Sequence, residues 1–110
     1  MNKFNAIKHT VDGITFDSKK EAVYYGSLLQ LRQAENPAER VVLIERQPRY
    51  DISIKNKYIG YYKADFRVAY ADGKQKVIDV KGYKKGAAYS LFRLKKKLVE
   101  AIYDIEIIEV

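Results

Sequence analysis

The sequence predicts an α/β (α+β) domain in which a mixed central sheet is flanked by helices. Two helical patterns are separated by several strand-like stretches along the 110 residues. The order hairpin, helix, three or four strands, helix, strand is typical of this class. The apolar share of 47% belongs to a folded globule. The length suits a single domain over residues 1–110.

Turn and cap signals define the elements in order. Residues 7–17 are expected to form a hairpin, because Asp12-Gly13 is a pair that two-residue turns prefer. Ser18 then caps a helix that runs to about Ala34. Further elements follow from alternation and apolar spacing: strands at 41–46, 50–54, 61–70 and 76–81, a helix at about 87–102 and a last strand at 105–110.

Composition restricts the classes of function. The chain has 21 Lys+Arg against 14 Asp+Glu, a net charge of +7. This excess favours a polyanionic partner such as nucleic acid, although it also serves simple solubility. No apolar run approaches the ~18 residues of a membrane span, and the N-terminus lacks the apolar stretch of a signal peptide.

Metal chemistry is restricted as well. The chain has no cysteine, which excludes disulfides and thiolate metal sites and fits a reducing cytoplasm. His9 is the only histidine, so a zinc site is not expected. A bound metal ion would need oxygen ligands.

The stretches 61–70 and 76–81 indicate how two aspartates face each other. A three-residue loop at 71–73, with glycine last, sets Phe66 opposite Ile78 and Asp65 opposite Asp79. A two-residue loop would instead set polar side chains against apolar ones. Apolar register and turn chemistry therefore agree on the three-residue loop.

Asp65, Asp79 and Lys81 then share one face of the sheet. Opposed carboxylates repel each other unless a cation lies between them. Two carboxylates and a lysine on adjoining strands can hold a divalent metal beside an activated water, the minimal apparatus for hydrolysing a phosphodiester. The alternative is a solvent-facing surface on which Lys81 neutralises the two aspartates, and Val77 on the same face argues against it.

Glu21 is a third candidate carboxylate. Helical spacing places it at the centre of the apolar arc of the first helix, where a carboxylate needs a partner. Ser18-Lys19-Lys20-Glu21 also matches a capping box. The competing interpretation is that Glu21 only bonds back to the amide of Ser18.

The second helix combines an apolar stripe with a basic ridge. The expected buried stripe consists of Leu91, Leu94, Leu98 and Ile102, with Phe92 and Val99 flanking it. On the opposite side we expect a ridge that suits phosphates: Arg93, Lys96 and Lys97. Lys95 projects on the apolar side. It either extends along the sheet to the solvent or points toward the same anionic centre as Lys81.

The ordered set of motifs resembles the PD-(D/E)xK nuclease superfamily. Glu21 lies on a first helix, Asp65 on a strand, and Asp79-Val80-Lys81 on the next strand, where it matches the (D/E)-x-K tripeptide. With the stretches 16–22, 64–66, 79–82 and 92–98, the chain is similar to a small phage-encoded family of endonucleases related to Holliday junction resolvases. The likeness covers about Lys8 to Leu98. One departure is Ala64, because the superfamily motif has a proline before the aspartate.

The resemblance implies a restriction-endonuclease-like core and a site for Mg²⁺, with Mn²⁺ as a substitute. Asp65, Asp79 and the carbonyl of Val80 would bind the metal, and Glu21 would hold a second metal or its water. Lys81 would orient or help activate the attacking water and stabilise the developing negative charge.

The implied function is a metal-dependent endonuclease that cuts branched DNA as a homodimer during DNA recombination, in the cytoplasm of a bacterial host cell. Exposed tyrosines and the last strand are candidates for the dimer interface. The expected DNA contacts are basic: Lys19, Lys20, Lys84, Lys85, Arg93, Lys95, Lys96 and Lys97. Two alternatives stay open, namely a DNA-binding accessory protein without catalysis, and a nuclease for nicked, flapped or single-stranded DNA.

Overall fold

The structure, a computed structural model, describes residues 9–82 and 84–110 and has the expected α+β content. No helix in these ranges is long and apolar enough to cross a membrane. The elements are β1 (His9–Val11), β2 (Ile14–Phe16), α1 (Lys19–Gln30), the 3₁₀ helix η1 (Leu31–Gln33), β3 (Val41–Arg46), β4 (Arg49–Ile54), β5 (Lys57–Lys63), β6 (Phe66–Tyr70), β7 (Gln75–Asp79), α2 (Gly86–Tyr103) and β8 (Ile107–Glu109).

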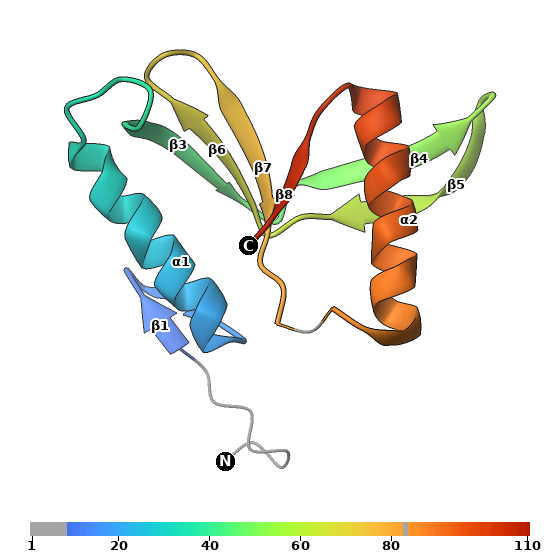
Figure 1. The fold of residues 1–110 in the computed structure, drawn as a ribbon, viewed down its shortest axis with the longest axis horizontal. Coiled ribbons are helices and arrows are strands. Elements are labelled where there is room, and N and C mark those ends of the chain that lie inside the picture. Colours follow the sequence, from blue (N-terminus) through green and yellow to red (C-terminus); the bar gives the residue numbers. More distant parts are fainter. Residues whose placement is uncertain (1–8, 83) are drawn as a thin grey trace, which may run out of the picture.

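A mixed four-stranded sheet forms the centre of the molecule (Figure 1). Its strand order is β3-β6-β7-β8. The first two pairs are antiparallel, and β7 and β8 are parallel, as the crossover through α2 requires. Helix α1 contacts β1, β2 and β3, whereas α2 contacts the β4–β5 hairpin. The predicted mixed sheet with flanking helices is therefore confirmed.

The turn between β6 and β7 has the predicted three-residue form. The amide of Tyr70 donates to the carbonyl of Lys74 at 2.9 Å, and Gly73 has φ +90°. Glycine adopts this left-handed conformation without the steric cost of a Cβ atom. Phe66 lies opposite Ile78, so the register deduced from the sequence is confirmed.

The first hairpin also forms as expected within the described residues. Asp12 and Gly13 have φ values of 52° and 78° between β1 and β2. Positive φ at both central residues matches the right-handed twist of the flanking strands. Residues 7 and 8 of the predicted hairpin lie outside the described ranges.

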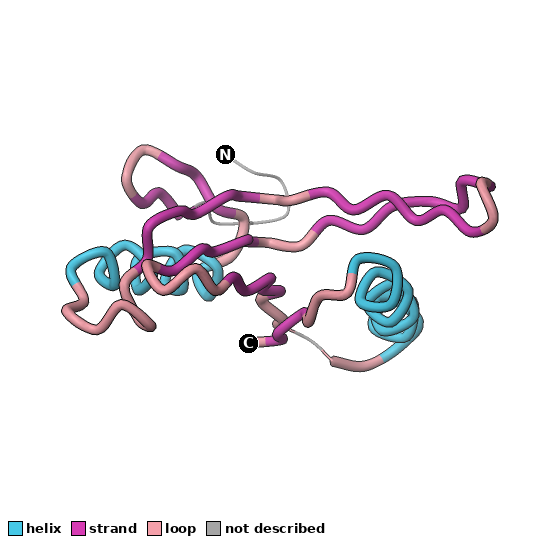
Figure 2. The backbone as a smooth tube through the Cα atoms, turned by 90° about the horizontal axis from the view of Figure 1, so that it is seen from above, coloured by secondary structure: helices cyan, strands magenta, loops and turns pink. Residues whose placement is uncertain are grey.

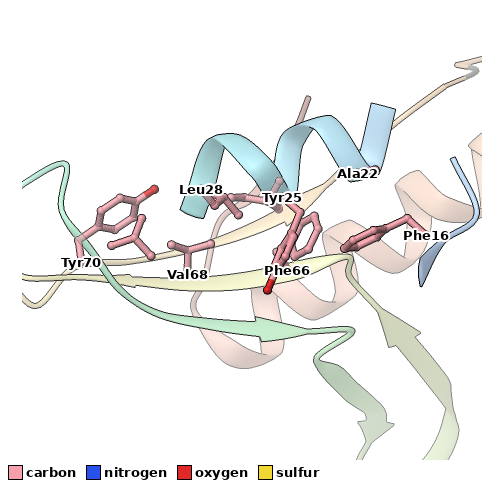
Figure 3. Close-up of a cluster of buried hydrophobic side chains, with 9 residues drawn as sticks. Phe16, Ala22, Tyr25, Leu28, Phe66, Val68 and Tyr70 are labelled. Atoms are coloured by element: carbon pink, nitrogen blue, oxygen red, sulfur yellow. The ribbon is translucent and has the colours of Figure 1, made fainter. Parts of the chain in front are cut away.

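Strand β7 contributes to two hydrophobic clusters. Ile78 belongs to the cluster beneath α1, and Val77, its neighbour on the other face, belongs to the cluster beneath α2. In the first cluster Tyr25 stacks on Phe66 with ring centroids 5.9 Å apart (Figure 3). The residue after these two, Asp79, therefore lies where both clusters meet.

The predicted strand at 61–70 is in fact two strands, β5 and β6, with Ala64 and Asp65 between them. The segment opposite this point is interrupted too, because β3 ends and β4 begins there. Gln47 has φ +51°, and Pro48 has no amide hydrogen. The amide of Ala64 donates to the carbonyl of Pro48, and the amide of Gln47 donates to the carbonyl of Asp65. A kinked long hairpin thus replaces the straight strand that alternation predicted.

Beyond this kink, the β4–β5 hairpin projects as an arm alongside α2 (Figure 2). Its tip is a turn at Lys55 and Asn56, with φ values of 51° and 65°. The pairing of β4 with residues 57–60 was absent from the sequence prediction. Lysine is an unusual residue for a turn with positive φ, so the turn signal was weak.

The predicted buried stripe of the second helix is wrong. Leu91, Leu94 and Ile102 are 53%, 56% and 43% exposed, and Leu98 is only half-buried. The helix instead buries Phe92 and Val99. Apolar residues cover a wide arc of α2, and their spacing does not reveal which half of that arc meets the body of the protein.

Other boundaries differ by a few residues from those expected. Helix α1 begins after the predicted cap Ser18, whose hydroxyl accepts from the amide of Glu21 at 3.1 Å. It ends at Gln30 and continues as the 3₁₀ turn η1. The last strand, β8, is shorter than predicted. Differences of this size are ordinary at the ends of elements.

The burial pattern of α2 predicts unequal effects of two truncations. Val99→Ala removes methyl groups from a fully buried site and should lower the free energy of unfolding by about 2 kcal/mol. In the monomer, Leu94→Ala should change it by less than ~0.5 kcal/mol, because the side chain is exposed there and alanine favours helix. Urea unfolding followed by circular dichroism measures both values. Equal losses of unfolding free energy in the two variants would instead support the buried stripe that the sequence predicted.

Candidate functional site

Asp79 is the only buried charged residue among those that the structure describes, with 6% of its surface exposed. One carboxylate oxygen accepts a hydrogen bond from the hydroxyl of Tyr62 at 2.5 Å. The other lies 2.9 Å from Nζ of Lys81. The ammonium group of Lys81 also lies 3.4 Å from the ring centroid of Phe92. The carboxylate is thus held by two side chains from different elements.

The backbone around this ion pair is fixed by the last residue of the chain. The amide of Lys81 donates to the carbonyl of Val110, and the amide of Val110 donates to the carbonyl of Asp79. The carbonyl of Lys81 accepts from Nζ of Lys20 at 2.5 Å. Strand β8 and helix α1 therefore both position the Asp79–Lys81 segment.

Asp65 lies at the kink between β5 and β6, and the regular pairing of β6 with β7 begins at the next residue, Phe66. Its amide donates to the carbonyl of Ile78 at 3.0 Å. Its carboxylate accepts from the amide of Val80 at 2.6 Å. Burial raises the pKa of Asp65; the Val80 amide opposes this rise, and the negative charge of Asp79 adds to it. The two aspartates interact electrostatically, as the register predicted.

Glu21 is half-buried and faces the same centre. Burial raises its pKa, and repulsion from Asp65 raises it further, whereas the guanidinium group of Arg46 lowers it. Asp17 and Asp79 also raise it. Glu21 thus lies within the electrostatic reach of both aspartates, while its amide takes part in the predicted Ser18 cap.

Two residues near the carboxylates were not found from the sequence. Tyr62 lies in the predicted strand at 61–70, and its hydroxyl donates to the carboxylate of Asp79. Arg46 is paired with Phe66 across the sheet and lies over the ring of Phe16 at 4.7 Å. Its buried Nε has no hydrogen-bond partner among the described residues. The register of β3 against β6 would have been needed to find Arg46.

The expected DNA-contacting residues divide into three groups. Lys20 and Lys96 have structural partners, since Nζ of Lys20 donates to the carbonyl of Lys81 and Nζ of Lys96 pairs with Glu109 at 3.1 Å. Lys96 is half-buried, contrary to its predicted place on an exposed ridge. Lys95 is half-buried and lines the same groove as Asp79 and Lys81. The others are exposed: Lys19, Lys84, Lys85, Arg93 and Lys97.

The groove beside Asp79 has a volume of about 250 Å³ and lies between β5 and α2. Tyr62 and Phe92 contribute apolar surface next to the ion pair. Its lining residues are Tyr61, Tyr62, Lys63, Asp79, Lys81, Ala88, Leu91, Phe92 and Lys95. Lysines from β5, from the loop before α2 and from α2 therefore line one groove with this carboxylate, and Lys81 is the one paired with it.

The donors suit a hard divalent cation in type, because Asp65, Asp79 and Glu21 supply carboxylate oxygens. Mutual repulsion contributes to the raised pKa values of Asp65 and Glu21, and a cation relieves such repulsion. In residues 9–82 and 84–110, however, no three acidic or histidine side chains come together as a metal-binding group. Both oxygens of Asp79 already have partners, which a metal ion would have to share.

These shifts predict a pH-dependent gain in stability for Glu21→Gln. A carboxyl whose pKa is raised on folding destabilises the native state above that pKa, and this penalty disappears as the pH falls below its unfolded pKa. Without divalent cations, the variant should melt about 2–5 °C above the wild type at neutral pH.

The difference in melting temperature should shrink as the pH falls toward ~4. Glu106→Gln, an exposed carboxylate elsewhere, serves as the control and should change little at either pH. Thermal unfolding in EDTA measures the effect. A Glu21→Gln variant less stable than the wild type at neutral pH would favour the interpretation that Glu21 only caps α1.

Comparison with known proteins gives a family and no closer relative. No curated protein and no solved structure matches the chain significantly. One family, described as "Protein of unknown function (DUF1064)", matches residues 1–107. Because this match spans nearly the whole sequence, the chain belongs to the DUF1064 family.

Proposed function

We propose that this protein is a metal-dependent endodeoxyribonuclease that hydrolyses phosphodiester bonds in branched DNA. The observation that carries the proposal is the Asp79–Lys81 ion pair beside Asp65. Two interacting carboxylates and an ammonium group at the end of a sheet match what phosphodiester hydrolysis needs. The resemblance to PD-(D/E)xK nucleases that resolve Holliday junctions suggests the substrate.

In this proposal the carboxylates would bind the metal ion, and Lys81 would contact the phosphate. Asp65 and Asp79, with the carbonyl of Val80, would hold Mg²⁺ or Mn²⁺, and Glu21 would hold a second ion or its water. When bound, the ion would supply charge neutralisation at the phosphate and a more acidic water. Lys81 is held beside Asp79 by an ion pair and by the ring of Phe92, so its ammonium group can contact the attacked phosphate.

Tyr62 would keep the carboxylate of Asp79 in place. Burial and the bond to Asp79 raise the pKa of Tyr62, so its hydroxyl stays protonated and donates. A water held by the carboxylates would attack phosphorus and release a proton to solvent. The phosphorus–oxygen bond to the leaving sugar would break, and the sugar oxygen would take up a proton from a second water. Lys81 would stabilise the negative charge that develops on the phosphate oxygens.

Surface charge supports DNA as the polyanion. The net charge of +7 favours association with phosphates. Lys84 and Lys85 are exposed in the loop that follows the Asp79–Lys81 segment, and Arg93 and Lys97 are exposed on α2. We place the protein in the cytoplasm of a bacterial host cell, where DNA recombination takes place.

A second candidate is a DNA-binding accessory protein that has kept the nuclease fold. It is favoured by the absence of an assembled three-carboxylate group in the described residues, and by the complete pairing of Asp79 with Tyr62 and Lys81. A nuclease for nicked, flapped or single-stranded DNA is a variant of the first proposal.

Cleavage assays separate these candidates. The wild type should cut a four-way junction with Mg²⁺ or Mn²⁺ and should not cut it in EDTA. Asp79→Asn and Lys81→Met should each lower the rate by at least about 10²-fold and retain DNA binding. Comparing a junction, a flap, a nicked duplex, a plain duplex and a single strand identifies the substrate.

Matched controls exclude a general effect of lost charge. Asp104→Asn alters an exposed aspartate whose left-handed backbone suits asparagine, and Lys74→Met alters an exposed lysine in the β6–β7 turn. Both should cut at the wild-type rate. DNA binding by the wild type without cleavage under either metal would contradict the nuclease proposal and favour the accessory protein.

We also propose that the nuclease is a homodimer, as the resemblance implies. Helix α2 offers a surface for it, because apolar residues recur there at alternating spacings of four and three: Ala87, Leu91, Leu94, Leu98 and Ala101. This is the heptad spacing by which helices pack against one another. The exposure of Leu91 and Leu94 leaves that seam without a partner in the described chain.

Light scattering on the purified protein should give the mass of two chains. Leu94→Glu should shift the protein toward the monomer, because it would place a charge in the proposed contact. Val42→Glu is the control, since Val42 is 60% exposed on β3, away from α2. A monomeric wild type at all concentrations would contradict the dimer, and equal effects of both variants would exclude α2 as its interface.

A further inference from the structure

The groove between β5 and α2 carries charge that the hydrolytic residues do not use. Lys63 and Lys95 both line it, and neither forms an ion pair within the described residues. Asp79 is the only acidic residue in the lining, and it is already paired with Lys81. The groove therefore keeps two uncompensated positive charges.

An aromatic ring lies at the same place. Tyr61 is 42% exposed. The guanidinium carbon of Arg49 lies 4.0 Å from its ring centroid, and Nζ of Lys95 lies 5.7 Å from it. An exposed aromatic ring beside lysine and arginine is the combination with which proteins bind unpaired nucleic acid, because every base can stack and every phosphate attracts a cation.

The groove is a small site that is open to solvent, with a volume of about 250 Å³. A single base can enter it from the open side. The occupant must also be anionic, because two of the three lysines in the lining have no carboxylate partner.

We propose that this groove binds one unpaired nucleotide of DNA, with the base on Tyr61 and the phosphate at Lys63 and Lys95. The inference rests on the proposed nuclease function, because Asp79 and Lys81 line the same groove and would receive the adjoining phosphate. Flaps and gaps carry such nucleotides, and a four-way junction offers them where its central base pairs open, whereas a plain duplex does not. The groove would thus select branched DNA by its unpaired positions.

Binding without divalent metal tests the stacking step apart from catalysis. The probes are a fluorescently labelled single strand and a duplex of the same length, followed by anisotropy in EDTA. Tyr61→Ala should weaken single-strand binding by about 5–20-fold, and Tyr61→Phe, which keeps the ring, by less than about twofold. Duplex binding should change by less than about twofold in both variants.

A neighbouring tyrosine provides the matched control. Tyr58 lies on the same strand, is 56% exposed and does not line the groove. Tyr58→Ala should weaken single-strand binding by less than about twofold, because Tyr58 reaches Tyr61 indirectly, through its hydrogen bond with Arg49. Thermal melts check that each variant is folded, and Tyr61→Leu, which fills similar space without a ring, replaces Tyr61→Ala if that variant is unstable.

The lysines are tested by salt dependence. Lys63→Gln and Lys95→Gln should each reduce the slope of log Kd against log salt for the single strand by about 0.7. Lys57→Gln, an exposed lysine on β5 outside the groove, should reduce it less. An unchanged slope in both groove variants would contradict a phosphate at this position.

The outcomes distinguish the groove from the nuclease. Equal losses in Tyr61→Ala and Tyr58→Ala, or equal losses for single strand and duplex, would overturn the nucleotide site. If the wild type cuts a junction and Tyr61→Ala binds single strands normally, only the groove inference fails. If no metal supports cleavage while the groove variants lose single-strand binding selectively, the nuclease proposal fails and the groove remains a binding site.

Discussion

The buried carboxylate of Asp79 ties the two halves of the molecule together. Burying a charge costs several kcal/mol unless partners compensate it. Here Tyr62 comes from the arm and Lys81 from the loop before α2, and Phe92 of α2 lies beneath the ammonium group. One side chain at the end of β7 thus links the arm and the loop, and α2 adjoins it through Phe92.

The carboxylates around Asp79 are poorly arranged for stability alone. Burial and mutual repulsion raise the pKa values of Asp65 and Glu21, so their charged forms destabilise the native state. Buried Nε of Arg46 has no partner in the described residues either. Unfavourable electrostatics and unsatisfied polar groups of this kind are common at functional sites, where a ligand can relieve them.

Local rules predicted the part of the site that depends on one turn. Alternation and the glycine of the β6–β7 turn gave the Phe66–Ile78 pairing, which places Asp65 near Asp79. The bond from Tyr62 to Asp79 could not be predicted in this way, because it depends on the kink at Pro48 that redirects β5. Arg46 likewise depends on pairing between strands far apart in the sequence.

The second helix shows a different limit. Its apolar residues cover more of the surface than one contact can bury, so the pattern identified a helix but not its inner face. The burial of Val99 and the exposure of Leu94 follow from contacts with β8 and with the arm, and the arm lies far away in sequence. The same surplus of apolar surface on α2 underlies the proposed homodimer contact.

Titration calorimetry with Mn²⁺ tests the central claim most directly, because it measures the predicted ion at the predicted carboxylates without any assumption about the DNA substrate. The account predicts saturable binding to the wild type that is weakened at least about tenfold in Asp79→Asn and unchanged in Asp104→Asn. Absence of binding in the wild type, or equal affinity in Asp79→Asn, would contradict a metal-dependent nuclease at this site.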